Sequence, residues 1–283
     1  MFLQFEDDFD LEIIADSGQC FRWNRVDARE RTAGDCLLPA YRIIAGDDCL
    51  YITALGEGCF ELECSEDEYC DRWADYFDMK EDYRSIRSRI DPEMDPFLWE
   101  AAEHEKGIRI LRQDPWEMLI SFIISQNKNI PAIRRSVEKL AEACGEMGVD
   151  TRRETYYKFP CPEAVASLTQ KELSDCSLGY RCRYVHAAAE AVARGELDPA
   201  KLLTAGDNEA MAELTALPGV GKKVASCVLL FGLHRTDAFP IDVWIRRILE
   251  EYYPEGYPFE RYSPYNGICQ QYMFAYVSKR KTK

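Results

Sequence analysis

The 283-residue sequence has no long apolar run and no recognisable secretory leader. No stretch approaches the roughly 20 apolar residues that cross a bilayer. The opening residues, MFLQFEDDFDLEII, lack the basic start and the apolar centre of a signal peptide. With 47% hydrophobic and 12% aromatic residues, however, the chain has enough apolar surface for a packed core. We therefore expect a folded cytoplasmic protein with no membrane partner.

Cysteine is abundant but lacks the spacing of a metal site. No pair among the twelve cysteines forms a C-x-x-C motif, and no secretory feature accompanies them. Reduced thiols packed as small hydrophobic residues are therefore favoured over a disulfide framework or a metal site. The sequence indicates no cofactor.

Basic charge is also scarce, with a net charge of −15, which argues against a nucleic-acid partner at first sight. The distribution of charge changes this interpretation. Residues 1–110 hold 28 acidic and 12 basic residues, a balance of −16. Residues 111–283 hold 22 acidic and 23 basic residues, a balance of +1. A phosphate-binding surface is therefore expected in the second part of the chain.

The hydrophobic period changes near residues 100–110 and predicts an α+β protein. YRII and CLYITAL flank a turn at residues 45–48, and GEG separates the second run from CFELEC, which is typical of antiparallel strands. Residues 66–95 are acidic and predict a helical, solvated connector. We expect an antiparallel β domain at residues 1–108 and a mainly helical domain at residues 109–283.

Three helices are predicted in the second part. WEMLISFIIS is apolar on all sides, as in a buried helix. NIPAIRRSVEKLAEACG carries apolar residues at helical spacing, with Pro131 in the first turn. YRCRYVHAAAEAVARGE forms the third helix and ends at Gly195.

Residues 214–233 contain a turn with two glycines, Gly219 and Gly221, between two helical patterns. Such a turn exposes backbone N–H groups at the start of a helix, where the helix dipole favours a phosphate. This helix–hairpin–helix pattern is common in DNA-binding proteins, and an ordinary helix connection is the alternative.

Lys223 and Asp242 make the hairpin more specific. Lys223 falls in the first helical turn, where the dipole disfavours a protonated amine, so it is a candidate nucleophile. Lys222 is interpreted as a phosphate contact. Asp242 precedes another helical run, in the sequence FPIDVW. An aspartate at this place is often only an N-cap, and Lys223 could be a second phosphate-binding lysine.

With these residues the sequence resembles the helix–hairpin–helix DNA glycosylases with a Gly/Pro-rich loop and an aspartate, and among them the 8-oxoguanine DNA glycosylases. The resemblance covers nearly the whole chain. Its markers are SGQCFRW at 17–23, QDP at 113–115, SQNKN at 125–129, LGYRCRY at 178–184 and GICQQYMF at 267–274.

The resemblance implies a lesion site. Lys223 would attack C1′ of the deoxyribose to form a Schiff base, which permits β-elimination, and Asp242 would stabilise positive charge on the sugar. The Gly18 carbonyl would accept a hydrogen bond from N7–H of 8-oxoguanine. The residues that would enclose the flipped base and read its edge are Cys227, Phe274 and Gln270.

The resemblance also implies how duplex DNA that contains 8-oxoguanine is held by what we expect to be a monomer. Tyr180 would fill the space that the flipped base leaves, and Asn127 and Arg181 would contact the partner base. A core aromatic and a surface cation are the alternatives for Tyr180 and Arg181. Family members can hold a structural cation at hairpin carbonyls, which no side chain here would reveal.

Two positions depart from the animal members. Trp244, which we assign to the DNA contact, replaces a histidine. Ala132 replaces an arginine that reads the cytosine opposite the lesion. The second departure predicts a relaxed preference for the opposite base.

Other functions stay open at this point. A monofunctional alkylpurine glycosylase would use only the aspartate. A glycosylase with an iron–sulfur cluster would need four C-terminal cysteines, but only Cys269 follows Cys227. A non-catalytic DNA-binding hairpin, and an additional protein partner of the acidic N-terminal part, are further alternatives.

Overall fold

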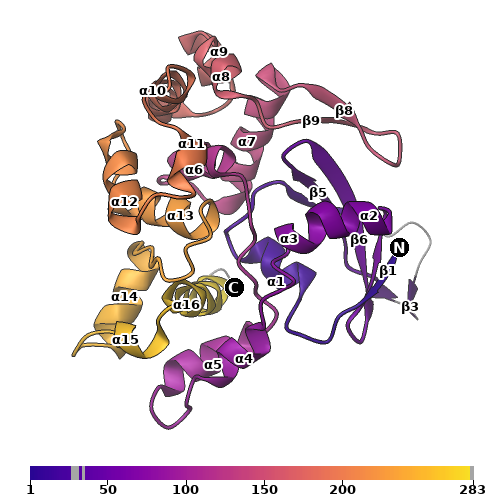
Figure 1. Ribbon diagram of the computed structural model, residues 1–283, viewed down its shortest axis with the longest axis vertical. Coiled ribbons are helices and arrows are strands. Elements are labelled where there is room, and N and C mark those ends of the chain that lie inside the picture. The colour runs from indigo at the N-terminus through magenta and orange to yellow at the C-terminus, as the bar shows by residue number, and fades with distance from the viewer. Residues whose placement is uncertain (27–31, 34–35, 281–283) are drawn as a thin grey trace.

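An antiparallel sheet and a larger set of helices lie side by side in the computed structural model, which describes residues 1–26, 32–33 and 36–280 (Figure 1). This is the predicted α+β class. None of the helices in these ranges combines the length and the apolar character of a membrane span.

The sheet has five strands in the order β1-β7-β6-β5-β2, all antiparallel. They are β1 (Phe2–Gln4), β2 (Trp23–Val26), β5 (Ala40–Ala45), β6 (Asp48–Gly56) and β7 (Cys59–Leu62). The turn between β5 and β6 occupies the predicted place, and Ala45 pairs with Asp48 across it. Two short strands, β3 (Thr32–Ala33) and β4 (Cys36–Leu37), pair with each other outside this sheet.

One face of the sheet packs against α1 (Leu11–Asp16) and the helical turns that follow β7. These turns are α2 (Glu66–Glu68), the π-helical turn η1 (Tyr69–Trp73) and α3 (Ala74–Tyr76), followed by α4 (Tyr83–Ser88). Residues 66–76 and 83–88 are helical, as predicted, whereas residues 77–82 and 89–95 form turns, and the prediction of a solvated connector is wrong. Trp73, Phe77, Tyr83, Ile86 and Ile90 are all buried. The many acidic residues around them concealed these apolar positions.

A second core joins the remaining helices. They are α5 (Pro96–His104), α6 (Pro115–Ser125), α7 (Ile130–Cys144), α8 (Pro162–Ala166), α9 (Gln170–Asp175), the 3₁₀ turn η2 (Gly179–Arg181), α10 (Cys182–Ala193), α11 (Pro199–Leu202), α12 (Asp207–Ala216), α13 (Lys222–Phe231), α14 (Val243–Tyr252), α15 (Phe259–Tyr262) and α16 (Asn266–Arg280). The three predicted helices correspond to α6, α7 and α10, and residues 116–124 of α6 are buried throughout, as expected. Helices α4 and α5, which precede the boundary predicted at residue 108, contribute to this same core.

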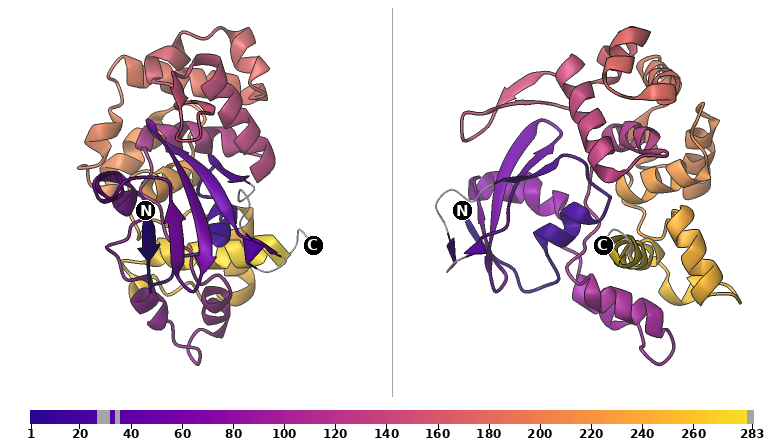
Figure 2. Two further views of the ribbon diagram at one scale, coloured as in Figure 1. Left: turned by 90° about the vertical axis from the view of Figure 1, so that its right-hand side faces the viewer. Right: turned by 180° about the vertical axis from the view of Figure 1, so that it is seen from behind.

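A small hairpin of β8 (Met147–Val149) and β9 (Thr155–Tyr157) was not predicted. It leaves the helical part and reaches over the sheet (Figures 1 and 2). Asp150 of the hairpin pairs with Arg42 at 2.8 Å and accepts a hydrogen bond from the Tyr51 hydroxyl, also at 2.8 Å. Arg152 pairs with Glu63 at 2.6 Å. The hairpin therefore ties the two parts together.

Arg109 lies fully buried at the junction of the two parts. Its guanidinium donates to the carboxylate of Asp7 at 2.8 Å and to four backbone carbonyls, those of residues 8, 77, 78 and 81. It also lies 4.2 Å from the centre of the Tyr83 ring. A buried charge of this kind is tolerated because every donor has a partner.

We expect Arg109→Met to lower the free energy of unfolding by about 3–5 kcal/mol, because it leaves a carboxylate and several carbonyls without their donor. Urea unfolding measures the change. Arg25→Met is the control, since Arg25 and its partner Glu12 are more than half exposed, and an exposed pair contributes less than about 1 kcal/mol. Equal losses for the two variants would contradict the structural role of Arg109.

Candidate active site

The predicted hairpin consists of α12, a turn at residues 217–221 and α13. Gly219 has a φ of +80°, and a Cβ at this position would lie 2.3 Å from the Tyr184 ring. A side chain therefore fits neither the backbone conformation nor the space. Gly221 precedes α13 in extended conformation and provides no side-chain cap, and both Gly221 and Lys222 are exposed. The first N–H groups of α13 are thus suited to an anion.

Lys223 lies in the first turn of α13 and is half-buried, with Nζ 5.4 Å from the centre of the Phe122 ring. Cys227 is one turn further along the same helix and is buried. Burial raises the pKa of the Cys227 thiol, Lys223 partly opposes this shift, and Asp242 adds to it. Both predicted groups thus act on the charge of the same buried thiol.

Asp242 is also the N-cap of α14, because its Oδ1 accepts a hydrogen bond from the Ile245 N–H at 2.8 Å. The sequence left open whether this residue is a cap or a catalytic carboxylate. The structure shows the cap, and the carboxylate also raises the pKa of the Cys227 thiol. The cap fixes the side-chain rotamer, so the carboxylate is oriented before any ligand binds.

The loop after α1 brings Gly18 against α16. Gly18 has a φ of +80°, and a Cβ there would lie 3.2 Å from Cε1 of Phe274 and 3.6 Å from the Ile130 side chain. Gln271 of α16 donates to the carbonyl of Ser17. Gln19 donates to the Arg109 carbonyl at 2.9 Å and accepts from the Leu111 N–H at 2.9 Å. The loop is therefore clamped from both sides.

Gln270 lies one helical turn before Phe274 on α16, so the two side chains share a face. Its Nε2 donates to the Pro240 carbonyl at 3.2 Å, just before Asp242 in the chain. Its Oε1 is buried and meets no donor among the described residues. A buried amide oxygen without a partner is costly and is available to a ligand donor.

Asn127 and Tyr180, predicted to enter the DNA, lie together on the surface. Asn127 has a φ of +52°, and its side-chain amide donates to the Tyr180 hydroxyl at 3.1 Å. The Tyr180 ring is 48% exposed. Arg181 differs from a surface cation, because it is only 6% exposed and donates to the carbonyl of Gln126 at 2.7 Å. The predicted contact of Arg181 with the partner base stays a prediction.

Trp244, in the first turn of α14, faces a different environment. It lines a cavity of about 180 Å³ with Phe97, Tyr252 and Tyr276. The Arg247 guanidinium lies 5.4 Å from the centre of its ring. The predicted DNA contact of Trp244 stays a prediction.

Three glutamines that hold the site together were missed at the sequence level. Gln19 and Gln271 clamp the Gly18 loop. Gln126 donates from Nε2 to the Gly219 carbonyl at 3.1 Å. Each donates a hydrogen bond to a backbone carbonyl that is remote in sequence, so no local sequence pattern predicts these contacts. Among the described residues, no cluster of three or more histidine, cysteine or acidic side chains is arranged to hold a metal ion. All eleven cysteines with described side chains are free thiols.

A hairpin with a lysine and an aspartate, completed by an N-terminal sheet, defines a DNA glycosylase of the helix–hairpin–helix class. Residues 2–119 match the family model of the 8-oxoguanine DNA glycosylase N-terminal domain, and residues 120–256 match that of the HhH-GPD superfamily base excision DNA repair proteins. The chain belongs to the 8-oxoguanine DNA glycosylase family.

Solved structures and curated relatives agree with this family. MBOgg1, in complex with a low-affinity DNA ligand, is 35% identical with a TM-score of 0.87, over 99% of this chain and 96% of that chain. The 8-oxoguanine glycosylase/lyase of Clostridium acetobutylicum, bound to DNA with cytosine opposite 8-oxoG, is 30% identical with a TM-score of 0.87, over 99% and 98%. A probable N-glycosylase/DNA lyase of Methanothermobacter thermautotrophicus is 29% identical over 87% of this chain and 83% of its own length.

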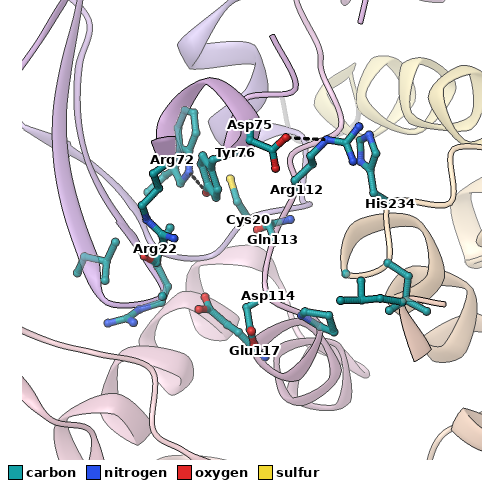
Figure 3. A pocket seen from close by; sticks show the side chains of 18 of the residues that line it. Cys20, Arg22, Arg72, Asp75, Tyr76, Arg112, Gln113, Asp114, Glu117 and His234 are labelled. Carbon is teal, nitrogen blue, oxygen red and sulfur yellow. Dashed lines mark hydrogen bonds and ion pairs between the residues drawn. The ribbon is translucent and has the colours of Figure 1, made fainter. Parts of the chain in front are cut away.

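A larger cavity, of about 430 Å³, has a lining that does not include Lys223 (Figure 3). Arg22, Glu117 and Arg112 line it from different sides, and none of the predicted site residues is in its lining. Pro115 and Gly232 also line it, so it meets α6 at its start and α13 at its end. Burial, partly opposed by Arg22, raises the pKa of Glu117 from its ordinary value of 4.5 to about 7.

Glu117 therefore makes the stability of the protein depend on pH. As the pH rises, the unfolded chain loses this proton first, so ionisation of Glu117 lowers the stability between about pH 4.5 and 7. We expect Glu117→Gln to match the native chain near pH 5 and to be more stable by on the order of 2–3 kcal/mol at pH 8. Urea unfolding at the two pH values measures this. Glu209→Gln on α12 is the matched control, because Glu209 is exposed. The prediction would be contradicted if Glu117→Gln and the native chain differed in free energy of unfolding by the same amount at both pH values.

Proposed function

We propose that this chain removes 8-oxoguanine from duplex DNA through Lys223 and Asp242 and cleaves the strand at the resulting abasic site. As a member of its family, the chain is a bifunctional DNA glycosylase and lyase of base excision repair. The observation that supports this assignment is the place of Lys223 in the first turn of the hairpin helix α13, one turn before the buried Cys227, together with the fixed carboxylate of Asp242 at the start of α14.

The proposed reaction begins with attack of the neutral Lys223 amine on C1′ of the damaged nucleotide. The bond between C1′ and the base breaks, and the base leaves with the electron pair and gains a proton. The ring oxygen then leaves C1′ and is protonated, which gives an iminium to Lys223. Loss of a C2′ proton expels the 3′ phosphate by β-elimination. Asp242 stabilises the positive charge that develops on the sugar during these steps.

The flipped base fits between Phe274 and Cys227 in this proposal. The Gly18 carbonyl accepts a hydrogen bond from N7–H, which guanine lacks, and an unpaired buried carbonyl costs about 1–3 kcal/mol. Gln270 reads the Watson–Crick edge with its amide, whose oxygen is buried and without a donor. The clamp on the Gly18 loop supports this role, because discrimination by one hydrogen bond needs a fixed acceptor.

On the DNA side, Gly219, Gly221 and Lys222 bind phosphates, and Tyr180 fills the space in the stack. Asn127 and Arg181 contact the partner base, and Trp244 contacts the backbone. We propose that the chain acts as a monomer without a cofactor. The same proposal places a structural cation at the hairpin carbonyls and includes no iron–sulfur cluster.

The principal alternative is a monofunctional alkylpurine glycosylase. A DNA-3-methyladenine glycosylase of Bacillus subtilis is 29% identical, but over only 52% of this chain. Lys223 and the N-terminal family match favour the bifunctional enzyme over this alternative. A non-catalytic hairpin protein would leave Lys223 and Asp242 without a role.

Borohydride trapping on a duplex with one 8-oxoguanine tests the proposal. The native chain should give a covalent crosslink, and Lys223→Gln should give none while still binding the lesion duplex. Asp242→Asn should bind as well but turn over about 10²–10³-fold more slowly, because one charge-stabilising group is lost.

Lys222→Gln is the matched control, one residue away from the proposed nucleophile. It should still crosslink, but bind more weakly and with a salt slope smaller by about 1, as for a lost phosphate contact. An undiminished crosslink with Lys223→Gln would overturn the covalent role of this residue. Excision without any crosslink would favour the monofunctional alternative.

The opposite-base preference is expected to be relaxed. Ala132 lies in the first turn of α7, next to Asn129, whose side chain caps that helix. It carries no group that reads a base. Single-turnover excision should therefore proceed at rates within about threefold opposite C, A, G and T, and Ala132→Arg should favour C by about tenfold, since one good base contact is worth about 1–3 kcal/mol. A strict preference of the native chain for cytosine would contradict this.

A further inference from the structure

Three surface turns that are remote in sequence meet at one residue, Gln126. They are the hairpin turn (residues 217–221), the Asn127 turn (residues 126–129) and the Tyr180 turn (residues 177–181). The hairpin turn leads directly to Lys223, and the Tyr180 turn presents the exposed aromatic ring. Gln126 is the C-cap of α6, so its backbone is fixed by the most buried helix of the molecule.

The side chain of Gln126 holds the hairpin turn. Its Nε2 donates to the Gly219 carbonyl at 3.1 Å and to the Ile123 carbonyl of its own helix, also at 3.1 Å. Gly219 has little freedom to move away, because the Tyr184 ring fills the place where a Cβ would be. The amide thus ties the turn before Lys223 to the end of α6.

The backbone carbonyl of Gln126 holds the Tyr180 turn. The Arg181 guanidinium donates to it from Nε at 2.7 Å and from Nη2. Its Nη1 donates to the Leu178 carbonyl at 3.2 Å. The same guanidinium lies 4.4 Å from the centre of the Tyr180 ring. An arginine that is 6% exposed and bonded in this way acts as a support for the ring.

The Asn127 turn completes the connection. Asn127, whose side-chain amide donates to the Tyr180 hydroxyl at 3.1 Å, directly follows Gln126. Lys128 donates from Nζ to the Ser177 carbonyl at 2.6 Å. The Tyr180 ring therefore packs on the Arg181 guanidinium, which binds the Gln126 carbonyl, and its hydroxyl binds the Asn127 side chain. Both connections lead back to residues at the end of α6.

We propose that Gln126 is a positioning residue that couples the hairpin turn to Tyr180. This inference rests on the proposed function, in which Tyr180 fills the vacated stack while Lys223 meets C1′ of the extruded nucleotide. Both events concern one nucleotide, so the distance between ring and amine must match the DNA. One residue, whose side-chain amide holds the hairpin turn and whose backbone carbonyl holds the Tyr180 turn, fixes that distance before binding.

A double-mutant cycle between Gln126 and Tyr180 tests the coupling. Gln126→Met keeps the size of the side chain and removes both hydrogen bonds from Nε2. On an 8-oxoguanine duplex we expect single-turnover excision to fall about tenfold, as for the loss of one or two hydrogen bonds. In the Tyr180→Ala background the same change should cost less than about twofold, because the position of the hairpin turn relative to the ring no longer matters once the ring is gone.

Two further measurements separate positioning from a general structural defect. Cleavage of a single-stranded oligonucleotide with an abasic site has no stack to fill, so Gln126→Met should stay within about twofold of the native rate there. Gln170→Met, an exposed glutamine at the start of α9, is the matched control and should leave duplex excision unchanged. Thermal unfolding of all variants completes the comparison.

Equal costs of Gln126→Met in the two backgrounds, or equal losses on duplex and single-stranded substrates, would overturn the coupling. Native-like excision by Gln126→Met would overturn it as well. These results differ from failure of the proposed function, in which the native chain itself would release no 8-oxoguanine.

Discussion

The contact between the Ser17–Gly18 loop and α16 is the constraint on which the proposed lesion pocket depends. The hydrogen bond from Gln271 to the Ser17 carbonyl joins residues 254 positions apart, and it sets Gly18 against the Phe274 ring. Gln19 fixes the other side of the loop to residues 109 and 111. Arg109 is itself held by backbone carbonyls at the junction between the two parts of the chain. The loop is therefore attached to a rigid segment.

Much of this organisation could be predicted from the sequence, because it depends on local patterns. The turn between β5 and β6, the buried α6 and the helix after Asn129 each carry their own periodicity and turn residues. The prediction that Lys223 and Asp242 act in one reaction required the family resemblance, because no local sequence rule relates two residues on different helices. In the structure both groups influence the pKa of the Cys227 thiol, in opposite directions.

Other features depend on long-range packing and could not be predicted in this way. Charged residues around Trp73 and Phe77 suggested a solvated segment, but Trp73, Tyr76 and Phe77 are buried against the sheet. The β8–β9 hairpin has strands of only three residues each, too short for a periodic signal. Arg181 was predicted to contact the partner base, and its bond to a backbone carbonyl 55 residues away was not foreseen. The cavity around Glu117 combines residues from both parts of the chain.

The β8–β9 hairpin has a mechanical consequence for any duplex that this protein binds. Arg42 and Asp150, Arg152 and Glu63, and Arg22 and Glu138 all bridge the sheet and the helical part. A hinge motion between the sheet and the helical part would break these ion pairs, which are partly or wholly shielded from water. The two parts of the protein therefore stay fixed relative to each other, and the DNA must bend and unstack to fit the binding surface. The free energy of this deformation is lowest where the duplex is already easily deformed, as at a mismatched or damaged pair.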